Sequence, residues 1–339
     1  MAPSANDQKM TMSPCAGRKD DMIAALRHQQ PSHAVPIWEI EFQAWDAASG
    51  RHMILGKEFE RLTAPEQEKA LHTNAEILLS VAEEMHWSAV GIPSGYWNSA
   101  PGQLAYYCLP WEARFRQSEV LRDMGCENLL LIANVGGILC ANYSEEFCEK
   151  MFDEPESIDA MAENGLKHSL ETARRFKDCG IETVMSASDM ADNNGPFFKP
   201  DQMERWVYPY LKRWTAALHS MGLFGIMHSD GNLTPYIEQL ASHGLDALQA
   251  IDPVAGMDIV ATKQKVGGRL CLCGNVDCGR LLLGTPEENF EATKKLLLAC
   301  KPGGNFILGA SNAVQPEVPM ANYRAMIEAW KQYGSYVDD

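Results

Sequence analysis

The stretch L-F-G-I-M-H-S-D-G, residues 223–231, decides how the rest of this chain is interpreted. Its apolar run predicts a short buried strand, which ends abruptly at His228, Ser229, Asp230 and Gly231. In β/α proteins, catalytic side chains gather where a strand gives way to a loop. A His-x-Asp sequence at a strand end is also typical of a simple hydrogen-bonded turn, because Asp-Gly favours turns. The other strands of the chain must decide between these two interpretations.

Eight short apolar segments of this kind alternate with helical segments. The predicted strands are 35–42, 88–93, 128–135, 181–189, 223–228, 247–253, 269–277 and 305–312. The predicted helices are 20–29, 65–87, 155–179, one that follows 197–200 and runs to 221, 236–243, 257–266, 286–300 and 319–333. The strand segments are apolar throughout, as expected of strands that are covered on both faces. We therefore predict the α/β fold class, with a single (β/α)8 barrel of the TIM type.

The domain organisation follows from composition along the chain. Residues 1–19 are polar and mixed, lack an apolar signal core, and predict a disordered N-terminal lead. Residues 20–339 are predicted to form one barrel domain, because no linker rich in Gly, Ser or Pro interrupts them. No run of 18 or more apolar residues predicts a transmembrane helix.

Charge and cysteine usage narrow the classes of partner. The net charge is −16 and the isoelectric point is about 5.0, which argues against nucleic-acid and anionic-membrane surfaces. A neutral or cationic small molecule is the easier ligand. The ten cysteines are scattered through predicted strands and helices, as expected of reduced, mostly buried thiols. We therefore expect a cytoplasmic protein.

An aromatic-rich segment, residues 96–115, interrupts the pattern between the second and third predicted strands. It contains Trp97, Tyr106, Tyr107 and Trp111 among Gly and Pro residues. One interpretation is an insertion that packs on its own small core. The other is a lid whose rings line a ligand pocket, because aromatic side chains supply large and geometrically specific contact area. Under the second interpretation, Trp97 and Tyr106 contact the substrate.

Polar side chains recur at the carboxyl ends of the later predicted strands. In chain order they are Asp189, Asp192, Asn193, Asn194, His228, Asp230, Asp252, Asn275, Asp277, Ser311 and Asn312. In a β/α barrel these strand ends share one face, and that face carries the active site. The alternative is that loops begin with polar residues and that Asn and Asp cap helices. We predict that Asp189, His228, Asp230 and Asn312 converge on one cavity.

The first predicted strand carries two carboxylates. Strand alternation would place Glu39 and Glu41 on the same face. Two like charges inside a barrel are unfavourable unless they are paired or used. We expect Glu41 and the neighbouring Trp38 to contact the substrate.

The motifs quoted so far resemble the uroporphyrinogen decarboxylase superfamily, and especially its branch of corrinoid-linked methyltransferases. The matching segments are R-H-Q-Q-P-S-H-A-V-P-I-W (27–38), A-S-D-M-A-D-N-N-G-P-F-F-K-P (187–200), H-S-D-G-N (228–232), I-D-P-V-A-G-M-D (251–258), G-N-V-D (274–277) and L-G-A-S-N…P-M-A-N-Y-R-A-M (308–326). They span nearly the whole chain after Asp20. The resemblance implies an eight-stranded β/α barrel, in agreement with the strand count.

Differences from the superfamily's motifs distinguish its branches. True decarboxylases carry an arginine-bearing R-Q-A-G-R segment after the first strand, which grips the propionates of a tetrapyrrole. Here that place reads W-E-I-E-F-Q-A-W-D, residues 38–46, with two glutamates and no arginine. A polyanionic tetrapyrrole would be repelled by such a wall. The resemblance therefore does not extend to porphyrin decarboxylation.

A metal site is implied in part. Related thiol methyltransferases hold zinc with an H-x-C pair after the fifth strand and a Cys after the last strand. These places fall here on His228, Asp230 and Asn312. Asn is a poor zinc ligand, so a thiolate-rich site is absent. His228 and Asp230 remain candidate ligands of zinc or another divalent cation, with Glu41 or Cys273 as further candidates.

The resemblance implies a methyltransferase that moves a methyl group from a small methylated compound to the cobalt of a separate corrinoid protein. An aryl methyl ether is the expected donor, as in an O-demethylase system, with a methylamine-type cation as the alternative. His228, Asp230 and Asp189 are the expected catalytic residues, because the departing oxygen needs a proton. Substrate contacts are expected from Trp38, Glu41, Trp97, Tyr106, Asn193 and Asn312. A homo-oligomer fits these observations too.

Two rival functions remain. A decarboxylase-like lyase acting on a small non-porphyrin carboxylate would keep the barrel and need no corrinoid partner. No arginine placed to grip a carboxylate is evident in the motifs, which counts against it. A non-catalytic binding protein is the second rival, and it would leave the clustered His and Asp residues without a role.

Overall fold

The computed structural model describes residues 19–95, 97–100, 103–105, 107–139 and 144–337, with the backbone alone described for 97–100 and 103–105. Seven strands pair in parallel in one sheet, in the order β1, β4, β5, β8, β9, β10, β11. Their bounds are β1 Ala89–Gly91, β4 Leu130–Asn134, β5 Thr183–Ala187, β8 Phe224–His228, β9 Ala247–Gln249, β10 Cys271–Cys273 and β11 Phe306–Ile307. Each lies within a predicted strand.

The segment around Ile37 closes this sheet into a barrel. Ile37 forms a parallel bridge with Leu308, just after β11, and Trp38 N donates to Leu308 O over 3.0 Å. On the other side, Ser88 N donates to Ile37 O over 2.8 Å, next to the start of β1. The segment is the eighth strand position, so the predicted (β/α)8 barrel is confirmed. It is not a regular strand, because the backbone bends at Ile40.

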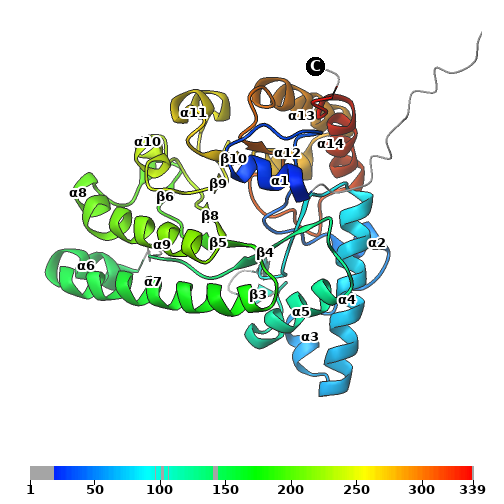
Figure 1. The fold of residues 1–339 in the computed structure, drawn as a ribbon, viewed down its shortest axis with the longest axis horizontal. Helices are drawn as coiled ribbons and strands as arrows, with labels where there is room; N and C mark the ends of the chain where they lie inside the picture. The colour runs from blue at the N-terminus through cyan, green and yellow to red at the C-terminus, as the bar shows by residue number, and fades with distance from the viewer. Residues whose placement is uncertain (1–18, 96, 101–102, 106, 140–143, 338–339) are drawn as a thin grey trace, which may run out of the picture.

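Helices form the outer layer around the strands (Figure 1). Their bounds are α1 Lys19–Leu26, α2 Trp45–Ser49, α3 Gly56–Glu60, α4 Ala64–Glu84, α5 Trp111–Asp123, α6 Glu145–Asp153, α7 Pro155–Asp178, α8 Pro200–Gln202, the π-helix η1 Met203–Val207, α9 Tyr208–Ser220, α10 Ile237–Ala241, α11 Ile259–Val266, α12 Cys278–Leu283, α13 Pro286–Cys300 and α14 Met320–Tyr333. Every predicted helix has a counterpart, and α13 matches its predicted bounds.

Local sequence explains where the long helices begin. Thr285 caps α13 by accepting from Glu288 N, and Glu288 Oε2 accepts from Thr285 N, which is a capping box. At the start of α4, Glu66 Oε2 accepts from both the backbone N–H and the hydroxyl of Thr63. Both helices carry Pro in the first turn, where its missing N–H is harmless.

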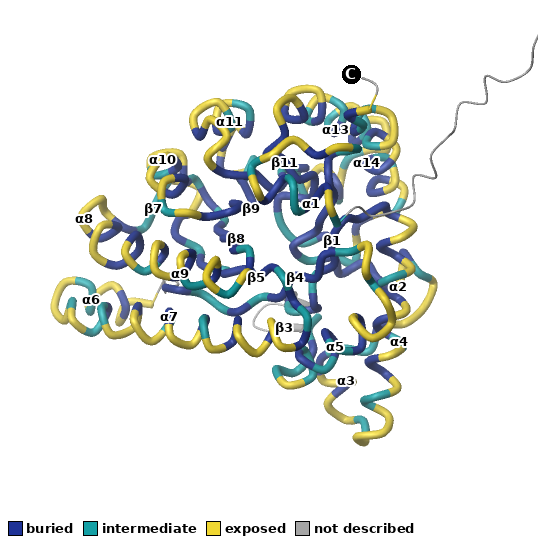
Figure 2. The backbone as a smooth tube through the Cα atoms, viewed as in Figure 1, coloured by how far each residue is buried: buried dark blue, intermediate teal, exposed yellow. Residues whose placement is uncertain are grey.

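Side chains from alternate strand positions fill the barrel interior. The cluster includes Ala89, Leu130, Ile132, Met185, Ile226, Ala247, Cys271, Cys273 and Ile307. Met22, Ala25 and Leu26 of α1 pack against it and close one end of the barrel. Figure 2 shows the same division, with buried strands inside and exposed helix faces outside. Because α1 covers one end of the barrel, the carboxyl ends of the strands lie at the uncovered end of the described structure.

The aromatic-rich segment is shorter than predicted. Strands β2 Trp97–Ala100 and β3 Gln103–Ala105 form an antiparallel hairpin, and residues from Trp111 onward already belong to α5. Trp111 and Phe115 pack on Phe176 of α7, at ring-centroid distances of 6.3 and 4.3 Å. The prediction that this segment extends to residue 115 is wrong, since helical spacing directs both Trp111 and Phe115 toward α7, where Phe115 is buried and Trp111 is partly buried.

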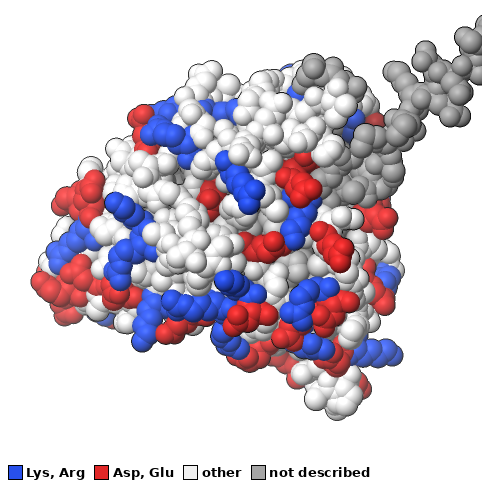
Figure 3. Space-filling view, in the orientation of Figure 1, with Lys and Arg blue, Asp and Glu red and all other residues white. Residues whose placement is uncertain are grey.

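The predicted disordered lead, residues 1–19, lies outside the described residues except for Lys19, which begins α1. On the face shown in Figure 3, basic and acidic side chains alternate along the lower helices. Pairs such as Arg175–Glu112 and Arg213–Glu163 account for this mixture. Within the described part of the chain, no helix is both long and apolar enough to cross a membrane.

Candidate active site

Three of the predicted side chains meet at the carboxyl ends of β5 and β8. The two strands pair with Ala187 beside His228, so Asp189 and Asp230 both emerge next to the imidazole. His228 Nε2 lies 3.7 Å from Asp189 Oδ1 and 3.8 Å from Asp230 Oδ1. The backbone N–H of Asp230 donates to Asp189 Oδ1 over 3.1 Å, which ties the two loops together. We call these three residues the carboxylate–histidine cluster.

Asn312 joins the cluster from the other side of the barrel. Its Nδ2 donates to Asp230 Oδ2 over 2.5 Å, and its Oδ1 accepts from Ala313 N over 2.6 Å. The second bond fixes the orientation of the amide, so the NH2 group faces the carboxylate. Asn312 therefore holds Asp230 in place and does not offer an oxygen to the cluster.

Gln249, at the end of β9, sets the orientation of His228. Gln249 Nε2 donates to the carbonyl oxygens of Ala310 and Ser311, over 3.2 and 3.1 Å. Its Oε1 must then face His228 Nδ1, which lies 2.5 Å away. An amide oxygen only accepts, so Nδ1 carries the proton. In neutral His228 the lone pair on Nε2 is thus directed at the two carboxylates.

This arrangement needs a proton or a cation at its centre. A lone pair facing two carboxylates is repulsive unless Nε2 is protonated or a cation lies between the groups. Burial raises the pKa of Asp230, and the charges of Asp189 and Asp252 raise it further, against lowering by His228 and the Asn312 hydrogen bond. One ligand atom from each of Asp189, His228 and Asp230 lies within 4.8 Å of the others. The donor set suits a divalent cation with an open coordination position.

The cluster borders an open cavity. It is lined by Asp189, Ala191, Asp192, Asn193, Asn194, Asp230, Gly231, Asp252, Val254, Cys278, Ser311 and Asn312, and encloses about 1050 Å³ including solvent at its mouth. Asn193 is exposed in the turn between β6 (Ala191–Asp192) and β7 (Gly195–Pro196). No described lining residue is Lys or Arg. Asp189, Asp230 and Asn312 line this cavity, whereas buried His228 lies behind the two carboxylates and is not a lining residue, so the four side chains meet as predicted but only three of them border the cavity.

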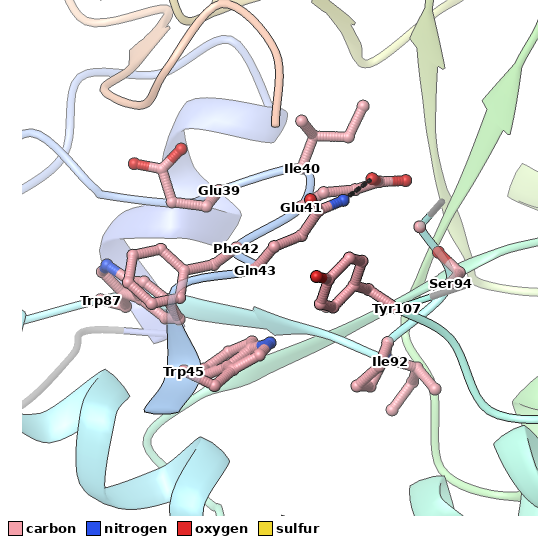
Figure 4. Close-up of a pocket in the computed structure, with 13 residues that line it drawn as sticks. Glu39, Ile40, Glu41, Phe42, Gln43, Trp45, Trp87, Ile92, Ser94 and Tyr107 are labelled. Carbon is pink, nitrogen blue, oxygen red and sulfur yellow. Dashed lines mark hydrogen bonds between the residues drawn. The ribbon is translucent and has the colours of Figure 1, made fainter. Parts of the chain in front are cut away.

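A second, small and more enclosed cavity of about 20 Å³ lies beside Glu41, and we call it the compartment (Figure 4). Its polar lining side chains include Glu39, Glu41, Gln43 and Tyr107. Phe42, Trp45 and Trp87 form its aromatic wall, with ring centroids 5.0 to 5.7 Å apart in edge-on contacts. The compartment adjoins the cluster, since the charges of His228 and Asp230 both act on Glu41.

The two glutamates of the first segment point in different directions, so the predicted shared face is wrong. The bend at Ile40 breaks the strand alternation on which that prediction relied. Glu39 is buried, and its carboxylate accepts from Ala310 N over 2.8 Å and from Tyr323 OH over 2.9 Å. Figure 4 shows its carboxylate directed away from that of Glu41. Burial raises the pKa of Glu39 to about 8.

Glu41 is the acidic group between the compartment and the cluster. Burial raises the pKa of its carboxyl to about 7, and Asp230 raises it too, whereas His228, the Gln43 hydrogen bond and Arg114 lower it. A carboxylic acid with such a pKa holds its proton in part at neutral pH. Glu41 is not a member of the three-residue group of potential ligands.

Two other predicted contacts are not supported. Cys273 packs in the barrel interior beside Ile226 and Ile307 and is 1% exposed, so it cannot reach the cluster. Trp38 lies in the same interior cluster and is 2% exposed, which argues against direct contact with a substrate.

The aromatic contacts give a mixed result. Tyr107 lines the compartment, whereas Trp111 packs against α7. Tyr106 and the side chain of Trp97 lie outside the described residues, so their predicted substrate contacts stay predictions.

Sequence reasoning missed several residues of the site. Gln249 is the clearest, and its signal was a single polar residue inside the apolar run A-L-Q-A-I. Cys278 is another, whose Sγ accepts from Asn312 N over 3.2 Å and whose pKa burial raises to about 11. Nothing in the local sequence marks Tyr323 of α14 as the partner of Glu39, because 284 positions separate the two.

Comparison with known proteins places this site in a family. The family model described as uroporphyrinogen decarboxylase (URO-D) matches residues 138–333, more than half of the chain, and includes the whole carboxylate–histidine cluster. The chain belongs to the URO-D family. The match begins after the segment that carries Glu39 and Glu41, so it does not bear on the compartment.

Individual relatives cover both branches of this family. The chain is 23% identical over 173 residues to the methylcobamide:CoM methyltransferase MtaA of Methanosarcina barkeri, covering 50% of this chain and 49% of that protein. It is 28% identical over 134 residues to the uroporphyrinogen decarboxylase of Anaeromyxobacter dehalogenans, covering 40% and 37% of the two chains. The chain thus spans about half the length, or less, of these curated relatives.

A solved structure supports the fold over the whole barrel. A methyltransferase from Methanosarcina mazei superposes with a TM-score of 0.72, at 15% identity, covering 93% of this chain and 98% of that one. At this identity the likeness concerns the URO-D barrel fold alone.

Proposed function

We propose that this URO-D family protein is a methyltransferase that moves a methyl group from a small methylated compound to the corrinoid cobalt of a partner protein. The observation that carries the proposal is the carboxylate–histidine cluster, with the Nε2 lone pair of His228 directed into it. The similarity to methylcobamide methyltransferases supports the same assignment. We propose that this reaction takes place in the cytoplasm.

The acidic lining of both cavities restricts the substrate. No described lining residue of the open cavity or of the compartment is Lys or Arg, whereas Glu39, Glu41, Asp189 and Asp230 line one or the other. A polyanionic tetrapyrrole or a free carboxylate would meet repulsion without a counter-charge. The lyase alternative has support from the decarboxylase relatives but not from this lining. A neutral methyl ether, with an aryl methyl ether as our choice, suits the site better.

The residues of the chain take distinct roles in this proposal. Asp189, His228 and Asp230 would hold a zinc or similar ion, which would supply Lewis-acid polarisation when bound. Asn312 fixes Asp230 through its NH2 group. Asn193, on the exposed turn, contacts the substrate or the partner at the mouth of the open cavity. A partner corrinoid protein would approach this same mouth, because α1 closes the other end of the barrel.

Methylation of free cob(I)alamin tests the proposal directly. The purified protein is incubated with reduced cobalamin and a panel of methyl ethers, and methylcobalamin is followed by its absorbance. Protein with and without added zinc is compared, and bound metal is quantified by elemental analysis. Transfer above the protein-free control is expected. Carbon dioxide release from small carboxylates, without methyl transfer, would favour the lyase instead.

A further inference from the structure

The place of Asp230 in the carboxylate–histidine cluster depends on the turn that carries it, residues 230–232. The backbone N–H groups of these three residues donate to three different segments of the chain. The bonds are Asp230 N to Asp189 Oδ1 over 3.1 Å, Gly231 N to Asp252 Oδ2 over 3.3 Å and Asn232 N to Asp192 O over 2.9 Å. Asp189 already belongs to the cluster, and Asp192 accepts through its backbone. Asp252 is therefore the acceptor side chain whose role is still unassigned.

We propose that Asp252 is a positioning residue of the cluster, whose carboxylate holds the turn so that Asp230 faces His228 Nε2 in the arrangement that binds a divalent cation. This inference deepens the proposed function, and rests on it for the cluster as a cation site. Asp252 is not a ligand in this proposal, because it lies outside the group of described side chains whose ligand atoms come together. It acts on Asp230 through the backbone of Gly231.

Both oxygens of the Asp252 carboxylate accept backbone hydrogen bonds. Oδ1 accepts from Val254 N over 2.9 Å, which fixes the side chain within its own loop after β9. Oδ2 is then presented to Gly231 N, in the loop after β8. Hydrogen bonds to a carboxylate are stronger than those between neutral groups. Asp252 thus ties the loop that follows Gln249 to the loop that follows His228, two residues that already pair across β8 and β9.

The turn also packs tightly against β6. Gly231 has a φ of +83°, in the left-handed region that favours glycine. A Cβ added to it would lie 2.4 Å from Ala191 C and 2.5 Å from Ala191 O. These are backbone atoms, which cannot move aside as the end of a side chain can. The turn is therefore packed on β6 and hydrogen-bonded to Asp252, and losing Asp252 would remove its side-chain link to the loop after β9.

The backbone that leads into Asp252 is strained. Ile251 is buried and has a φ of +49°, which β-branched residues rarely adopt. Its carbonyl oxygen accepts from Asn275 Nδ2 over 2.7 Å, in the loop after β10. Strained conformations persist only where surrounding contacts hold them, and they concentrate at functional sites. Strain at Ile251 is what we expect where the direction of the next side chain must be fixed.

The charge of Asp252 provides a second way to influence the cluster. Its negative charge acts on Asp230 through space, and it would also attract a cation. Both side chains are partly exposed, so salt screens this interaction. The hydrogen bond to Gly231 N is a contact that salt does not screen in this way. Ionic strength therefore distinguishes positioning from charge.

Zinc affinity, measured by chelator competition, is the first test. Asp252→Ala should bind zinc about 10- to 100-fold more weakly than wild type, as is typical when the support of a metal ligand is removed. The loss should persist in about 0.5 M KCl, where charges are screened. Asp258→Ala is the matched control, because Asp258 also accepts from two backbone N–H groups but lies outside the lining of the open cavity. Its zinc affinity should stay within about twofold of wild type, since distant sites act independently.

Gly231→Ala disturbs the same turn through its contact with β6. The added methyl group would push the turn off Ala191, so zinc affinity should fall even with Asp252 present. The double variant should lose little more than the more affected single variant, because changes to one shared element are not additive. Thermal melts show which variants are folded. Should Gly231→Ala fail to fold, the comparison of Asp252→Ala with Asp258→Ala still decides.

The outcomes separate this inference from the function on which it rests. Equal zinc affinity in Asp252→Ala and wild type would overturn the positioning role, and so would a loss that vanishes in KCl. Additive losses in the double variant would show that Asp252 does not act through the turn. A wild type whose zinc affinity depends on Asp252 but which transfers no methyl group would overturn the proposed methyl transfer alone. A folded wild type that binds no zinc would overturn both this inference and the proposed cation site.

Discussion

The open cavity and the compartment adjoin each other at the same end of the barrel, and carboxylates line both. The negative charge of these carboxylates is offset in a different way in each. In the open cavity, Asp189 and Asp230 are half-exposed and face an imidazole nitrogen and an amide NH2 group. In the compartment, Glu39 and Glu41 are more deeply placed, and burial raises the pKa values of both to about 8 and 7.

The difference shows that solvent access decides how a protein accommodates acidic side chains. Where water and a histidine are near, charge is kept and a cation is favoured. Where the carboxyl is buried, the proton is kept instead, because a buried charge without a counter-charge is strongly unfavourable. One end of this barrel thus holds half-exposed carboxylates beside a histidine, and buried carboxyls whose pKa values are raised.

The largest expected effect comes from the open cavity. His228→Ala should lower methyl transfer to cob(I)alamin by about 10²- to 10⁴-fold, because the imidazole is the group around which both carboxylates are arranged. The free energy of unfolding should change by no more than roughly 1–2 kcal/mol. His219→Ala is the matched control, since His219 bonds to Asp246 just before β9, at the opposite end of the barrel. Near-normal transfer by folded His228→Ala would exclude the proposed role.

A smaller effect is expected from a change at Gln249, the buried residue that orients His228. Gln249→Leu removes the acceptor for His228 Nδ1, and the affinity for zinc, measured by chelator competition, should fall by about 10- to 100-fold. It also leaves the carbonyls of Ala310 and Ser311 without their donor, at a cost of about 1–3 kcal/mol. Gln43→Leu, in the compartment, should leave zinc affinity unchanged. Equal zinc affinity in Gln249→Leu and wild type would contradict the tautomer assignment.

The compartment should be recognisable by the pH dependence of stability. The pKa of Glu39 rises from 4.5 to about 8 in the folded protein, so the folded protein binds more protons than the unfolded chain between these values. Its contribution is complete below about pH 4.5 and is lost as pH rises through 8. Glu39→Gln should remove a decline on the order of a few kcal/mol between pH 5 and 8, measured by urea unfolding. An unchanged slope would show that Glu39 is ionised throughout, and exposed Glu163→Gln serves as control.

The smallest effect is expected at the rim. Asn193 lies on an exposed turn whose backbone is held by Asp192, so Asn193→Ala removes a side chain without disturbing its neighbours. Methyl transfer should change by about two- to threefold, which corresponds to roughly 0.5 kcal/mol. A loss comparable to that of His228→Ala would mean that the rim, and not the cluster, governs catalysis.

The sequence by itself determined the barrel and the residues that meet in the carboxylate–histidine cluster. Apolar runs and helix caps are local signals, so eight strand positions and α13 could be predicted from neighbouring residues. Parallel strands end on one face, and for this reason Asp189, His228, Asp230 and Asn312 were expected together and are found together.

Only the tertiary structure decided how the side chains of Glu39, Glu41 and His228 are oriented and how deeply they are buried. The bend at Ile40 separates Glu39 from Glu41, and no residue pattern in 35–42 announces it. The tautomer of His228 depends on two backbone carbonyls, of Ala310 and Ser311, that orient Gln249 from more than sixty positions away. The pKa of Glu41 depends on burial beneath segments distant in the chain. Orientation and burial arise from packing between segments, so they enter only when the chain has folded.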